Sequence, residues 1–251
     1  MDAVSISARQ DTVVQGGYNR LTWLKRLTVL AILGFFFGLY MGLSYAGTDA
    51  NQGNVQRIFY FHVSAFAAAT VSFFTAVIGG IAYLQTRDGK WDTLSYAGVE
   101  VGFTLSIITL ITGMTWARPT WNTWWTWDPR LTSTAVMTLT YAAYLMLRNS
   151  IESLDRQRMF SAVYAILAIT TVIFTFMITR IRPDTIHPTV VGPSATNSKG
   201  MFEMVENMRV AFMVNMMIWT VLIAPALVWW RVRLGNISEL VAKKRIELME
   251  L

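Results

Sequence analysis

The chain has no cysteine, only two histidines and few charged residues. The absence of cysteine excludes disulfide bonds, thiolate metal sites, CxxCH cofactor attachment and cysteine nucleophiles. Charged residues make up 14% of the chain, whereas soluble domains carry about 25%. Hydrophobic residues reach 54%. Because they occur in repeated runs of about twenty, the composition is typical of a polytopic membrane protein.

Six apolar runs are long enough to cross a bilayer as helices. They cover residues 27–46, 63–84, 95–115, 131–147, 159–179 and 210–230. The sequence has no internal repeat and no soluble stretch of domain size. We therefore expect residues 1–251 to form one all-α integral membrane domain with six transmembrane helices.

Lysine and arginine are distributed unevenly between the two sides of such a protein. Six spans put both termini on one side, which then carries 14 basic residues, whereas the other side carries 7. The positive-inside rule places the more basic side in the cytoplasm. The net charge of +6 is therefore interpreted by location: the uneven distribution of basic residues predicts an N-in, C-in orientation, and nucleic-acid binding is a poor interpretation of the charge. Residues 47–61, 117–130 and 180–209 are expected to face outward.

Five of the ten tryptophans lie within twelve residues, between the third and fourth expected spans. The segment, residues 116–133, reads WARPTWNTWWTWDPRLTS. One or two tryptophans at that depth would be interfacial anchors, but five beside Asp128 and Arg130 exceed what anchoring needs. Flat rings stack on other flat rings, and Arg118 and Arg130 suit carboxylate recognition. A planar ligand with acidic edges, such as a porphyrin, is the first hypothesis.

The predicted topology places both histidines on the outward side. His62 stands at the entrance of the second span, and His187 lies in the last outer loop. Neutral imidazole is a common axial ligand of haem iron, so two histidines from separate loops would fill both axial positions. Either histidine alone is more simply an interfacial side chain. The combination with the tryptophan segment favours haem ligation.

The tryptophan segment resembles the WWD signature of haem-handling proteins in cytochrome c maturation. Within that superfamily, the length and the six spans are similar to the CcmC family, as are GVEVGFTLSIITLITGMTWA in the third span and FHVSAFAAA around His62. The resemblance implies that His62 and His187 are the axial metal ligands of one haem b, bound transiently as cargo. It also implies a haem platform formed by Trp116, Trp121, Trp124, Trp125, Trp127 and Asp128.

The same resemblance implies a transfer task rather than an enzymatic one. Proteins of this family hold haem at the periplasmic face of the bacterial inner membrane and present it to the haem chaperone CcmE. The ABC transporter subunits CcmA and CcmB and the small membrane protein CcmD are the expected partners. Our own candidates for contacts to the haem propionates are Arg57, Arg118, Arg130, Arg180 and Arg182, each of which could equally contact the interface or a phospholipid.

Three other functions fit parts of the pattern. A haem-exporting ABC-type permease would need a separate ATPase, because the chain has no GxxxxGK[ST] motif. A b-type cytochrome subunit would normally place its histidines within spans, and a haem ligase of this superfamily would be much larger. Glu100, the one acid inside an expected span, could mark a haem entry route or a transporter contact, but a structural role is favoured.

Overall fold

The computed structural model describes residues 3–182, 184–190 and 204–249, with side chains from residue 21 onward except at positions 239 and 243. Every regular element in this part of the chain is helical. In chain order the elements are α1 (Ala3–Tyr40), η1 (Met41–Tyr45), η2 (Asn54–Gln56), α2 (Arg57–Thr86), α3 (Gly89–Trp121), α4 (Pro129–Ser150), α5 (Leu154–Ile181), α6 (Glu206–Met217), η3 (Ile218–Ile223) and α7 (Ala224–Met249). The prediction of an all-α protein is confirmed.

The expected spans coincide with these helices, which are longer than the apolar runs within them. Five helices of the described residues are long and apolar enough to cross a membrane, so the chain is a multi-pass membrane protein. The fourth expected span, 131–147, is helical in α4 but is not one of the five. The threonines and tyrosines of α4 make it less apolar than the five candidate spans. The number of six spans and the orientation stay predictions.

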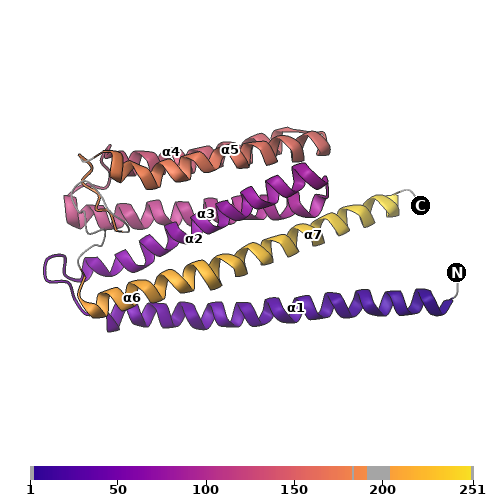
Figure 1. Cartoon of the computed structure of the whole chain (residues 1–251), viewed down its shortest axis with the longest axis horizontal. Coiled ribbons are helices and arrows are strands. Elements are labelled where there is room, and N and C mark those ends of the chain that lie inside the picture. Colours follow the sequence, from indigo (N-terminus) through magenta and orange to yellow (C-terminus); the bar gives the residue numbers. More distant parts are fainter. Residues whose placement is uncertain (1–2, 183, 191–203, 250–251) are drawn as a thin grey trace.

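The helices run along one common direction, with α2 and α3 between two groups (Figure 1). Helices α4 and α5 lie on one side of this pair, and α1 with α6 and α7 lies on the other. The connections 46–56, 122–128 and 184–190 gather at one end, which we call the loop end. The start of α1 and the end of α7 point away from it, so both tails lie opposite the loop end.

The contact between α2 and α3 is backbone against backbone. A Cβ atom on Gly79 would lie 2.6 Å from the backbone nitrogen of Ser95, and one on Gly98 would lie 2.6 Å from the carbonyl oxygen of Ser72. Small residues permit such an approach in membrane helices, where van der Waals packing replaces the hydrophobic driving force. The pair α2–α3 therefore forms the closely packed centre of the bundle.

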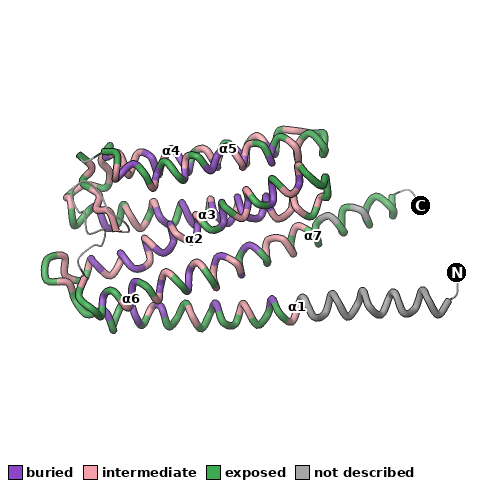
Figure 2. Tube along the Cα trace, in the orientation of Figure 1, coloured by how far each residue is buried: buried purple, intermediate pink, exposed green. Residues whose placement is uncertain are grey.

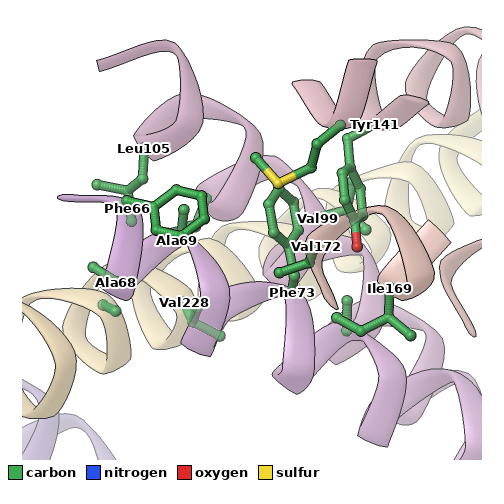
Figure 3. Close-up of a cluster of buried hydrophobic side chains, with 14 of the residues drawn as sticks. Phe66, Ala68, Ala69, Phe73, Val99, Leu105, Tyr141, Ile169, Val172 and Val228 are labelled. Carbon is green, nitrogen blue, oxygen red and sulfur yellow. The ribbon is translucent and has the colours of Figure 1, made fainter. Parts of the chain in front are cut away.

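Buried side chains from α4, α5 and α7 pack around this pair (Figure 3). Phe73 of α2 stacks on Tyr141 of α4 with ring centroids 3.6 Å apart. The buried faces of the helices point toward one another, and the outward faces of α1 and α5 carry large exposed apolar residues, as expected for contact with lipid (Figure 2).

Ion pairs join the helices near the end opposite the loops. The two guanidinium nitrogens of Arg148 in α4 each donate to one carboxylate oxygen of Asp92 in α3, both at 2.7 Å. Glu100 of α3 lies 2.5 Å from Arg231 of α7. Partly buried carboxylates in a membrane protein are tolerated when paired. This pairing supports the structural interpretation of Glu100.

Replacing Gly98 with alanine should destabilise the protein, although alanine favours helix by about 1 kcal/mol. The new methyl group would collide with the Ser72 carbonyl, which is backbone and cannot rotate away, and overpacking of this kind costs about 1–3 kcal/mol. The measurement is the thermal unfolding midpoint of the purified protein in detergent. Gly235→Ala is the matched control, because its Cβ would meet only side-chain atoms; equal midpoints for the two variants would contradict the prediction.

Candidate functional site

A cavity of about 230 Å³ lies at the loop end, among α2, α3, α4, α5, α6, the loop 122–128 and the segment after α5. Its walls are mainly apolar and aromatic. The lining comprises His62, Val63, Phe66, Ala67, Thr109, Leu110, Gly113, Met114, Trp116, Trp121, Trp125, Arg130, Leu131, Thr134, Phe176, Thr179, Arg180, His187, Pro188, Thr189, Val190 and Met216. The cavity thus combines both histidines with three of the clustered tryptophans.

His62 lies in the second turn of α2 rather than at its entrance, because the helix begins at Arg57. Its Nδ1 is 3.0 Å from the carbonyl oxygen of Thr109 and 3.1 Å from the hydroxyl oxygen of Thr112, both in α3. A carbonyl can only accept, so Nδ1 carries the proton and Nε2 keeps its lone pair. Gly113 leaves room for the ring, since a Cβ there would lie 3.0 Å from His62 Cε1.

His187 lies in the non-helical segment that follows α5 and has the same tautomer. Its Nδ1 donates to the carbonyl oxygen of Pro188 at 3.2 Å, which again leaves Nε2 as the free nitrogen. Burial, and secondly the positive charge of Arg130, lower the pKa of His187 from 6.5 to about 4. At neutral pH the imidazole is therefore uncharged, the form that binds a metal.

The two imidazoles lie close together. Their ring centroids are 6.3 Å apart, with the ring planes inclined by 38°. With a metal–imidazole bond of about 2.0 Å and a ring centre roughly 1.2 Å beyond the nitrogen, two imidazoles on opposite sides of one metal have centres about 6.4 Å apart. The observed separation is therefore compatible with two imidazoles that would hold one metal ion between them. Hydrogen bonds to the second nitrogen of each ring are the usual support for metal-binding histidines.

The five clustered tryptophans divide into two groups. Trp116, Trp121 and Trp125 line the cavity, and Trp116 and Trp121 lie edge-on to His187 with centroids 6.4 and 6.3 Å away. Trp124 and Trp127 are 55% and 81% exposed and do not line it. Trp116 and Trp121 belong to α3, which continues through Pro119 to Trp121, whereas Trp125 is the one tryptophan of the loop 122–128 that lines the cavity.

Of the five arginines considered for anion binding, Arg130 and Arg180 line the cavity. The Arg130 guanidinium donates to the carbonyl oxygen of Thr175 and lies 4.8 Å from the ring centre of Phe66. The other three, Arg57, Arg118 and Arg182, lie elsewhere. Arg57 is the first residue of α2, Arg118 donates to Asn122 at the end of α3, and Arg182 pairs with Asp184.

Asp128 is buried behind the cavity wall rather than in it. Its carboxylate caps α4, accepting from the backbone N–H groups of Arg130 and Leu131 at 2.9 and 3.4 Å. Pro129 lies in the first turn of α4, where its missing N–H costs nothing. The same carboxylate accepts from Thr185 and from the N–H of Ile186.

Several residues of the site were not found from the sequence. Thr109 contributes a backbone carbonyl, which any residue type could supply. Gly113 contributes the absence of a side chain beside His62, and nothing in the sequence links this glycine to that histidine. Phe66 and Phe176 look like ordinary core residues of a membrane helix. Thr185, two positions before His187, carried a usable signal, because threonine in a loop often bonds the backbone two residues on.

The chain is similar to one known protein family and to several of its members. The model of the CcmC family, described as heme exporter protein C, matches residues 12–247. Heme exporter protein C of Rhodobacter capsulatus is 33% identical over 135 residues, 54% of each chain. That of Paracoccus denitrificans is 35% identical over 107 residues, 43% of this chain and 44% of the relative. That of Escherichia coli K12 is 30% identical over 134 residues, 50% and 51% of the two chains.

In these alignments the chain spans about half the length of the curated relatives it matches. The family model reaches further, from before the first expected span to the last turns of α7. The chain therefore belongs to the CcmC family, the family of heme exporter protein C.

Proposed function

We propose that this protein binds haem b as transient cargo through His62 and His187 and hands it on for cytochrome c maturation. The observation that carries the proposal is the pairing of these two histidines. They are the only two in the chain, yet their rings lie 6.3 Å apart with each Nδ1 bonded to a backbone carbonyl. Both Nε2 atoms are thus free to ligate the iron of one haem.

The walls of the cavity suit a porphyrin. Trp116, Trp121 and Trp125 offer flat faces and edges to the macrocycle. Arg130 and Arg180 are the candidates for the propionates, since both line the cavity. Arg130 is held by a carbonyl and an aromatic face, which leaves its charge available to a carboxylate of the cargo.

Partial enclosure suits a carrier better than a permanent cofactor site. Pockets that enclose small ligands measure about 300–1,000 Å³, and this cavity of about 230 Å³ is smaller. Haem would therefore keep an exposed edge from which a partner can take it. Family membership supports the haem chaperone CcmE as the acceptor, with CcmA, CcmB and CcmD as partners. The site would then face the periplasm from the bacterial inner membrane, and the task is transfer rather than enzymatic catalysis.

The proposed orientation can be tested with single cysteines, because the chain has none of its own. Asn51→Cys lies at the loop end and Glu152→Cys in the turn between α4 and α5, and both positions are exposed. A membrane-impermeant maleimide should label Asn51→Cys in intact spheroplasts and Glu152→Cys only after permeabilisation. The cysteine-free parent is the control, and the reverse labelling pattern would refute a periplasmic site.

Replacing His62 or His187 with alanine should convert bound haem from six-coordinate low spin to five-coordinate high spin. Removing one imidazole opens one axial position, and added imidazole should restore the low-spin spectrum by filling it. The measurement is the absorption spectrum of the purified protein with added haem. Arg182→Ala, an exposed position in the same loop, is the control; a low-spin spectrum in the double histidine variant would exclude this ligand pair.

The division of the tryptophans predicts unequal effects on haem affinity. Trp121→Ala or Trp125→Ala should weaken binding severalfold, since an aromatic contact contributes about 0.5–1.5 kcal/mol beyond area burial. Loss of Trp116, Trp121 and Trp125 together should weaken it by orders of magnitude. Trp124→Ala, at a largely exposed position, should keep wild-type affinity. Haem titration followed by absorbance measures all four variants, and equal losses for Trp124 and Trp125 would contradict the division.

A further inference from the structure

The buried carboxylate of Asp128 connects two segments that are far apart in the sequence. As the N-cap of α4 it accepts from the N–H groups of Arg130 and Leu131. It also accepts from the Thr185 hydroxyl, at 3.0 and 2.8 Å to its two oxygens, and from the Ile186 N–H at 2.8 Å. The segment that carries His187 is thereby attached to the start of α4.

These bonds continue to His187 itself. The hydroxyl of Thr185 donates to Asp128 and accepts from the N–H of His187 at 3.2 Å. Ile186, the residue between them, is held through its own N–H. Three consecutive residues are therefore fixed by one carboxylate, directly or through the threonine, and the last of them bears the imidazole.

This geometry argues against direct contact between Asp128 and the haem. The side chain is only 7% exposed, and it is not part of the cavity lining in the described residues. Its oxygens already accept four donors at hydrogen-bonding distance. A negative charge facing the acidic propionates would also repel them.

We propose that Asp128, acting through Thr185, is the positioning residue that holds His187 at axial distance from His62. The proposal rests on the function proposed above, because it takes His187 as a ligand of the haem. Asp128 then contributes to haem binding without touching the haem, because its hydrogen bonds position the segment that carries the ligand. Loss of such support typically weakens metal binding tenfold to a hundredfold.

The test separates this positioning role from helix capping. Thr185→Val has nearly the same shape, leaves the Asp128 cap intact and removes the hydroxyl, whereas Thr185→Ser keeps the hydroxyl. Asp128→Ser keeps a good N-cap residue but is too short to reach Thr185 and Ile186 as well. Asp88→Ser is the matched control, because Asp88 caps α3 by accepting from the Lys90 N–H at a position remote from the site.

Each full-length variant is purified in detergent and titrated with haem while the absorption spectrum is recorded, with and without imidazole. Thr185→Val and Asp128→Ser should bind haem at least tenfold more weakly and show a high-spin fraction that added imidazole converts to low spin. Thr185→Ser and Asp88→Ser should keep wild-type spectra. If Asp128→Ser does not accumulate in membranes, Thr185→Val decides the question alone.

His187→Ala, measured in parallel, distinguishes the two ways of failing. If it loses the low-spin spectrum while Thr185→Val keeps both spectrum and affinity, the positioning role is refuted and the ligand assignment stands. If His187→Ala itself keeps the wild-type spectrum, the ligand assignment is refuted and the positioning role with it.

Discussion

The close approach of α2 and α3 is the constraint on which the candidate site depends. Gly79 and Gly98 let the two backbones touch, so side chains on neighbouring turns must fit within a narrow space. At the loop end of this contact, the Thr109 carbonyl of α3 lies within hydrogen-bonding distance of His62 on α2. A wider separation of the helices would leave the imidazole with no fixed tautomer. The close packing of α2 and α3 thus also determines which nitrogen of His62 carries the proton.

Charged groups have different kinds of partner at the two ends of the bundle. Away from the loops, Arg148 is matched by both oxygens of Asp92, and Glu100 by Arg231, so these charges are neutralised within the protein. At the loop end, Arg130 is held in the cavity wall by the Thr175 carbonyl and two phenylalanine rings. The first arrangement stabilises the fold, and the second keeps positive charge beside a cavity suited to an acidic ligand.

Much of the fold could be predicted from the sequence, because hydrophobic runs and their lengths directly report membrane helices. The fourth segment shows the limit, since α4 is a full-length helix whose threonines lower its hydropathy. The pair of histidines could be proposed because the chain offers no others. The sequence does not predict which tryptophans line the cavity, because that depends on where α3 ends and on the path of the loop that follows it. The sequence does not predict the positioning role proposed for Asp128 either, because its partner Thr185 lies in a loop 57 residues further along the chain.

The two histidines lie in different kinds of structural element. His62 belongs to a helix in the packed centre of the bundle, whereas His187 belongs to a non-helical segment that the Asp128 carboxylate connects to α4. Loop segments of this kind open locally more easily than packed helices. In a chelate with two ligands, the weaker attachment opens first and the stronger one keeps the metal at high effective concentration for rebinding. With haem bound as proposed, the local opening energy of the His187 segment would set the residence time of the haem. An acceptor that occupies the vacated axial position would turn this reversible opening into directional release.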